Sequence, residues 1–391
     1  MAYPTAIGCG CLLGAGGMSH LLAAEWSAQP IFSMQTDYDS DRNMGEGTQG
    51  SEEAVLYGDL KLQRAIESTQ IVLEPRFDLR RYSDSIWGPG SDRSLNGAFT
   101  WTGERMKLSL TGFIASQSTL TTEVLETGII NGDARRRSSQ ASGEWDWYQD
   151  ERHVAFLQFG YQSAKYSGDA LLEYELPGYR YPSASLGEKV SITDRTTVAA
   201  SLFGDALSSD RQGNSSHEEG VQLEVTHQFS ERITLDVAAG ESRRSLYGQR
   251  GSGTNATVML SRTYERGSFS FNYTRSLVPY GTGFLVQRQQ FGTTLSRSLT
   301  PTLDLNFTLL RVKNSASAVL LGIDRPYYDN GVLGLSWRMS ESWTLQPQVS
   351  TNWSNPIELT RTGPTVATAT VHEWRAQVTL VWQPLPDSKS R

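Results

Sequence analysis

Charged side chains recur at every second position in one segment of the chain, namely Glu74, Arg76, Asp78 and Arg80. Successive side chains of a β-strand point to opposite faces, so these four predict a ladder of alternating charge on one face. Asp59 and Lys61 repeat this spacing in the preceding segment and could lie beside the ladder. The ladder could contact hydroxyls and carboxylates of a sugar polymer weakly and repeatedly, or it could be a paired charge network that stiffens a wall.

A second set of polar side chains follows the same pattern in later segments: Gln222, Glu224, Arg288, Gln290, Gln346 and Gln348. The amides in this set both donate and accept hydrogen bonds, which suits carbohydrate hydroxyl groups. A wall in contact with water would have a similar composition. We therefore predict that both sets line a path for a polar solute.

The sequence gives little support for catalysis or metal binding. The chain has 5 histidines, and no two of them form an H-x-x-x-H pair. It contains no Gly-x-Ser-x-Gly elbow and no phosphate-binding loop of the G-x-x-x-x-G-K-[ST] type. We expect no catalytic residue, no metal site, no cofactor and no enzymatic activity.

The segments that carry these side chains alternate apolar and polar residues with a period of two. In TLDLNFTLL, Leu303, Leu305, Phe307 and Leu309 fall on one face, while Asp304, Asn306 and Thr308 fall on the other. About eighteen such segments follow one another from about Ile31 to Gln383, without an interdomain linker. This pattern predicts one large closed sheet.

The connections between the segments are alternately short and long. The short ones have the polar, Gly- or Pro-containing chemistry of tight hairpins, at residues 66–68, 103–105, 150–151, 193–195, 230–232, 265–267, 300–302 and 340–342. The longer ones include residues 39–52, 120–137, 168–178, 207–218, 315–326 and 355–370. Outer-membrane barrels have short periplasmic turns and long outer loops. We predict an all-β transmembrane antiparallel up-and-down β-barrel of about 18 strands, in the outer membrane of a Gram-negative bacterium.

The charged side chains identify the lumen face of each strand. A charge facing lipid at the middle of the membrane costs roughly 2–4 kcal/mol, so the face with the charges must be the inner one. Aromatic side chains gather next to the short turns and predict an interfacial girdle there: Phe99, Trp101, Trp145, Trp147, Trp337 and Trp343.

Composition agrees with a barrel. Hydrophobic residues make up 38% of the 391 residues and mean hydropathy is -0.40, so no apolar run approaches the length of a spanning helix. A spanning strand needs only about 9–11 residues, and only every second one must be apolar. The formal net charge of -7 argues against a nucleic-acid partner.

The first 24 residues differ from the rest. Residues 6–24 (AIGCGCLLGAGGMSHLLAA) have the composition of a signal-peptide core with cleavage near Ala24, although no Lys or Arg precedes Arg42. Both cysteines, Cys9 and Cys11, lie in this segment. We expect residues 1–24 to be a signal peptide, with a truncated start or a disordered tail as alternatives, and residues 25–391 to form one barrel domain.

Three features carry a family resemblance: the start IFSMQTDYDSDRN, the alternating long and short hairpins, and the final strand EWRAQVTLVW. Together they resemble the outer-membrane β-barrel porins associated with bacterial exopolysaccharide export of the Wzx/Wzy type. The resemblance covers nearly the whole chain after the first 24 residues. It implies a barrel that passes polysaccharide across the outer membrane with a periplasmic export protein, surrounded by outer-membrane lipid and inserted by the barrel assembly machinery.

A barrel of this strand number has a backbone diameter of roughly 35–40 Å, which side chains cannot fill. The connection 315–326 contains the apolar run AVLLGI, which could fold inward as a constriction or contact lipid or a neighbouring loop. The main alternative to polysaccharide export is a general or small-solute diffusion porin. The third hypothesis is a structural or adhesive barrel, or a barrel enzyme.

Overall fold

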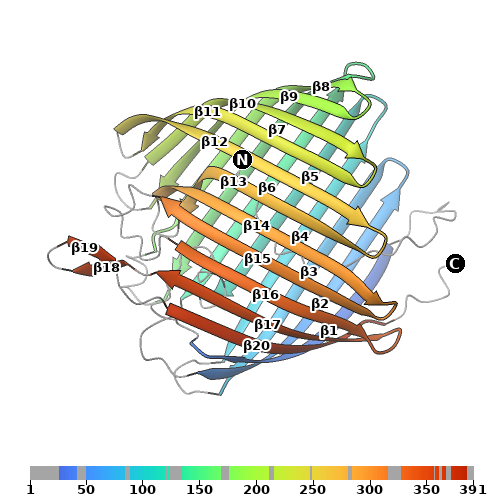
Figure 1. The fold of residues 1–391 in the computed structure, drawn as a ribbon, viewed down its shortest axis with the longest axis vertical. Coiled ribbons are helices and arrows are strands. Elements are labelled where there is room, and N and C mark those ends of the chain that lie inside the picture. The colour runs from blue at the N-terminus through green and yellow to red at the C-terminus, as the bar shows by residue number, and fades with distance from the viewer. Residues whose placement is uncertain are drawn as a thin grey trace.

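The computed structural model describes residues 26–41, 50–83, 89–119, 122, 134–168, 176–210, 215–246, 249–280, 284–315, 327–355, 357–360, 363–366 and 371–384. Within them the chain forms a closed 18-stranded antiparallel barrel (Figure 1). Neighbouring strands in the sequence are neighbours in the sheet, and β20 pairs with both β17 and β1 to close the ring. The predicted fold class is therefore confirmed.

The barrel strands are β1 (Trp26–Asp39), β2 (Ser51–Ile66), β3 (Thr69–Tyr82), β4 (Gly90–Thr102), β5 (Met106–Ser118), β6 (Arg135–Tyr148), β7 (His153–Ser167), β8 (Tyr179–Thr193), β9 (Thr196–Ser209), β10 (Ser215–Ser230), β11 (Ile233–Leu246), β12 (Gln249–Tyr264), β13 (Gly267–Tyr280), β14 (Phe284–Thr300), β15 (Leu303–Ser315), β16 (Tyr327–Arg338), β17 (Trp343–Asn355) and β20 (Val371–Trp382). Strands β18 (Ile357–Thr360) and β19 (Gly363–Val366) form a separate hairpin that projects beyond the loop side of the barrel in Figure 1.

The short connections lie together at one end of the barrel, as the sequence predicts. The register shifts by one residue beside the turns after β8, β10 and β14, which places a β-bulge next to each turn. In the turn after β6, Asp150 Oδ1 accepts hydrogen bonds from the backbone N–H of Arg152 (2.7 Å) and of His153 (2.9 Å). These donors stabilise the carboxylate and hold the pKa of Asp150 below its usual range.

Two of the long connections are shorter than the sequence predicts. The connection expected at 207–218 is reduced because β9 continues to Ser209 and β10 begins at Ser215, with Ser215 paired to Ser208. Strand β6 likewise begins at Arg135, inside the connection expected at 120–137. Polar residues extend these ladders beyond the apolar pattern because backbone pairing needs no apolar side chain.

The exterior of the barrel is apolar, and its large side chains are exposed. Leu56, Leu202 and Leu223 are 54%, 63% and 62% exposed. By the alternation of a strand they lie on the face opposite Asp59, Asp205 and Glu224, respectively. A soluble sheet would bury these side chains in a core, so their exposure on a closed barrel identifies the lipid face. No helix in the described part of the chain is long and apolar enough to cross a membrane.

Aromatic side chains lie on this outer face beside the short turns. Trp145, Trp147, Trp337 and Trp343 are between 42% and 55% exposed, and Trp343 pairs in register with Trp382 of the closing strand. The Trp382 ring stacks on Phe32 with 5.8 Å between ring centroids, which extends the aromatic belt across the closure. This is the girdle that the sequence predicts at the turn-side membrane interface.

Candidate functional site

The charge ladder lies on the inner face of β3, with Asp59 and Lys61 beside it on β2. Asp59 and Arg76 are register partners, and Asp59 Oδ1 lies 3.8 Å from Arg76 Nε. Lys61 Nζ lies 3.9 Å from Glu74 Oε1, and the Arg76 guanidinium stacks 4.5 Å above the Tyr57 ring. The side chains of these two ion pairs are 29–47% exposed. Long, half-exposed pairs of this kind contribute little stability, so their charges stay available to a solute in the lumen.

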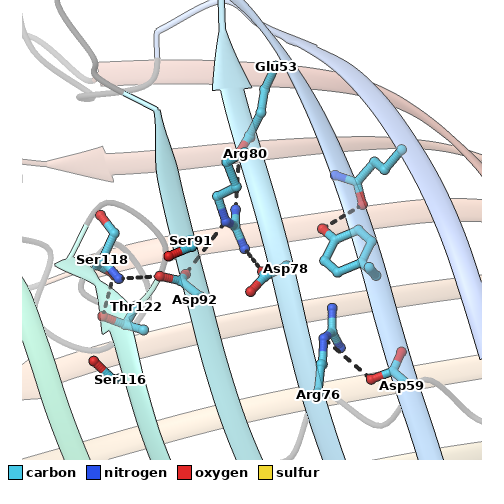
Figure 2. Close-up of polar contacts among 12 residues, drawn as sticks. Glu53, Asp59, Arg76, Asp78, Arg80, Ser91, Asp92, Ser116, Ser118 and Thr122 are labelled. Atoms are coloured by element: carbon cyan, nitrogen blue, oxygen red, sulfur yellow. Dashed lines mark hydrogen bonds and ion pairs between the residues drawn. The ribbon is translucent and has the colours of Figure 1, made fainter.

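The other two members of the ladder are buried. Figure 2 shows the Arg80 guanidinium between three carboxylates from β2, β3 and β4. Its nitrogens lie 3.1 Å from Glu53 Oε1, 2.6 Å from Asp78 Oδ2 and 3.5 Å from Asp92 Oδ2. The Arg80 side chain is 11% exposed, and the three carboxylates are at most 5% exposed. Asp78 and Arg80 are thus part of the wall, and only the other half of the predicted ladder faces the open lumen.

This buried network crosses the closure of the barrel. Arg375 of β20 contacts Asp37 of β1 at 2.7 Å and Glu53 of β2 at 3.2 Å. On the other side of Arg80, Asp92 binds Arg135 at 2.9 Å and accepts the backbone N–H of Ser118 at 2.8 Å. The network therefore links β20, β1, β2, β3, β4 and β6 near their loop-side ends. The sequence pattern did not identify the other acidic residues of this buried network, Asp37, Glu53 and Asp92, although each lies on the lumen face of its strand.

The polar side chains of the second set lie in three separate sectors of the inner wall. Gln346 and Gln348 pair in register with Thr379 and Gln377 of β20, so they lie within four strands of the ladder. Gln222 and Glu224 lie on β10. On β14, Arg288 Nε donates to Asn314 Oδ1 at 3.0 Å, and Gln290 is 8% exposed. The structure places these residues around the lumen and does not gather them into one binding site.

A third group of charges, which the sequence reasoning did not select, lies on β6 and β8. Lys189 Nζ is 2.5 Å from Glu144 Oε1 and 3.1 Å from Asp146 Oδ1. The same ammonium lies 4.9 Å from the centre of the Phe156 ring. Glu144 and Asp146 lie on the lumen face of β6, opposite the exposed Trp145 and Trp147, and Lys189 lies on the lumen face of β8. The lumen wall is therefore charged in more than one sector.

The hairpin of β13 and β14 narrows the loop-side mouth. β12 pairs with β13 only as far as Ala256 and Arg275, whereas β12 stays paired with β11 back to Gln249. Beyond Arg275 the hairpin leaves the wall next to β12, and the Cα atoms of β14 come within 8 Å of those of β9. Because β9 lies on a different part of the ring, the end of the hairpin must lie inside the lumen.

Apolar side chains hold both faces of this hairpin. On one face, Leu277 and Leu285 pack against inner-wall residues of β7, β8 and β9: Ala164, Tyr179, Tyr181 and Leu207. On the other face, Val278, Tyr280 and Val286 pack around Leu176. Full burial of such side chains contributes roughly 1.5–3 kcal/mol each. The run Leu277-Val278 breaks the period of two, and this signal could have identified a segment buried on both faces.

The inward segment predicted from AVLLGI lies within residues 316–326, outside the described residues. The constriction that the structure does describe is built by a different hairpin. In the described part of the chain, no group of three or more His, Cys, Asp or Glu side chains is arranged to hold a metal ion.

The sequence matches no protein-family model and no curated protein. Similar solved structures include OccAB4 from Acinetobacter baumannii, with 9% identity, coverage of 91% of this chain and 98% of that chain, and a TM-score of 0.45. OpdQ from Pseudomonas aeruginosa has 9% identity, coverage of 92% and 97%, and a TM-score of 0.46. The FrpB iron transporter from Neisseria meningitidis has 9% identity, coverage of 90% and 82%, and a TM-score of 0.43.

The closed strand ring, the apolar exterior with its aromatic girdle and the polar inner wall define the class of this protein. It is a transmembrane β-barrel of the outer membrane of Gram-negative bacteria.

Proposed function

We propose that this barrel is a porin that lets hydrophilic solutes diffuse across the outer membrane. The observation that carries the proposal is the open half of the charge ladder, Glu74 and Arg76, together with its partners Lys61 and Asp59 on β2. These four side chains line the lumen as half-exposed, loosely paired groups. A conducting wall must bind a solute weakly enough to release it. Ion pairs of 3.8–3.9 Å leave each charge hydrated and meet this condition.

Reconstitution into liposomes tests the proposal. Vesicles that contain the folded barrel should swell in an isotonic monosaccharide solution, and the swelling rate should fall as the sugar is lengthened to oligosaccharides, because the inward hairpin narrows the mouth. Protein unfolded by heating before reconstitution is the control and should give no swelling. A folded barrel that admits neither sugars nor ions would contradict the porin function.

A second candidate is export of an acidic polysaccharide, delivered to the turn side by a periplasmic export protein. The observation in its favour is that Lys61 and Arg76 are both half-exposed cations of the inner wall, and that the Arg76 guanidinium lies 4.5 Å from the centre of the Tyr57 ring. Cations and an aromatic face suit a chain of sugar carboxylates and hydroxyls. Weak repeated contacts would let such a chain slide.

Gene deletion separates the two candidates. Export predicts loss of extracellular polysaccharide with unchanged uptake of small solutes, and diffusion predicts the reverse. Under export of an acidic polymer, changing Lys61 and Arg76 together to Ala should lower polysaccharide output. Changing Gln346 and Gln348 to Ala is the matched control, because it removes no charge from the same sector of the wall.

A further inference from the structure

The inward hairpin has a polar attachment at the point where it leaves the wall. Arg244 of β11 lies on the lumen face, and its Nη1 donates to Gln287 Oε1 on the hairpin at 2.6 Å. Its Nη2 donates to Asn255 Oδ1 at 2.9 Å. Asn255 directly precedes Ala256, the last residue of β12 that pairs with β13. One guanidinium therefore bridges the gap where the backbone pairing between β12 and β13 has ended.

Neighbouring side chains fix the orientation of Arg244. Its Nε donates to Glu218 Oε1 at 2.9 Å and to Ser242 Oγ at 3.1 Å. Glu218 Oε1 also accepts from Asn255 Nδ2 at 3.2 Å and from Ser242 Oγ. The side chains of Arg244 and Glu218 are 8% and 2% exposed. Each of the three guanidinium nitrogens thus donates a hydrogen bond: Nε to β10 and β11, Nη2 to β12 and Nη1 to the hairpin.

A glycine makes room for this arrangement. A Cβ atom placed on Gly253 of β12 would overlap the Arg244 guanidinium, including Cζ, Nη1 and Nε. Gly251, two residues earlier on the same strand, would have no atom within 4 Å of such a Cβ. The absence of a side chain at residue 253 is therefore a condition for the position of Arg244, whereas the glycine at residue 251 is not.

We propose that Arg244 is the positioning residue that holds the β13–β14 hairpin inside the mouth, and that it thereby sets the size limit for solutes. The proposal rests on the porin function proposed above. Apolar packing of Leu277 and Leu285 determines where the end of the hairpin lies. The Arg244–Gln287 hydrogen bond fixes the base of the hairpin, where backbone pairing with β12 is missing.

Single-channel conductance and liposome swelling test this proposal on two variants, Arg244→Gln and Gly253→Ala. The first removes the guanidinium, and the second displaces the guanidinium without removing its charge. Both should raise the unitary conductance about twofold and should admit longer oligosaccharides than the unchanged protein, because the base of the hairpin is released. Arg243→Gln and Gly251→Ala are the matched controls, since Arg243 is exposed and Gly251 has open space. Neither control should change the conductance or the size limit.

The outcomes separate this proposal from the porin function. If the unchanged protein conducts, and both test variants fold by heat-modifiable migration but keep its conductance and size limit, the role of Arg244 is overturned and the porin function is left intact. If the unchanged protein does not conduct but the test variants do, the role of Arg244 is supported and open diffusion is contradicted. Silence of all five folded proteins would overturn both.

Discussion

Replacing Arg80 by Met should lower the free energy of unfolding by about 3–5 kcal/mol, because it leaves buried carboxylates without their cation. Glu53 keeps a partner in Arg375, and Asp92 keeps Arg135, so Asp78 should carry most of the loss. Urea unfolding of the reconstituted barrel, followed by tryptophan fluorescence, measures the effect. Adding Asp78→Asn to the Arg80→Met protein should recover part of the loss, because it removes the unpaired buried charge.

Arg76→Met is the matched control for this prediction. It removes the same guanidinium from the same strand, but the Arg76 side chain is 47% exposed and its carboxylate partner is 3.8 Å away. The expected loss of stability is within about 1 kcal/mol. Equal destabilisation by the two substitutions would contradict the division of the ladder into an open and a buried half.

Replacing Leu223 by Arg should cost roughly 2–4 kcal/mol of stability and slow membrane insertion, because the charge would face lipid. Leu223 is 62% exposed on the outer face. It lies six residues from Phe229, which is beside the turn after β10. Six residues of a strand tilted by about 40° rise roughly 15 Å, which places Leu223 near the middle of the membrane.

Gln222→Arg provides the comparison for this prediction, because it introduces the same side chain one residue away on the same strand. Gln222 lies on the lumen face of β10 and is in register with Ser201 of β9 and Gly240 of β11. Its substitution should cost far less, since the new charge meets water. Folding into lipid vesicles, measured by heat-modifiable migration and urea titration, distinguishes the two. Equal damage from Leu223→Arg and Gln222→Arg would show that the assignment of faces is wrong.

The sequence alone was sufficient to predict the barrel, its strand number and the inner and outer faces of strands such as β10, β15 and β17. The reason is physical. A strand with lipid on one side and water on the other must alternate apolar and polar side chains with a period of two, so the sequence of the strand shows which face contacts lipid and which contacts water. Residues such as Leu305 and Asn306 show this alternation without any knowledge of their neighbours. The turn chemistry beside each strand sets the register locally, which fixes antiparallel pairing along the ring.

Only the tertiary structure decided which charges face the open lumen and which are buried in the wall. Arg76 and Arg80 are both arginines on the same face of β3 and lie close together in sequence, yet the Arg76 side chain is half exposed and the Arg80 side chain is buried. The difference comes from Glu53, Asp92 and their partners on other strands, which no local pattern specifies. The position of the inward hairpin also depends on residues distant in sequence, because Leu277 belongs to the same buried cluster as Leu207 and Tyr181. Contacts between strands that are distant around the ring depend on closure of the barrel, and closure is a property of the whole sheet.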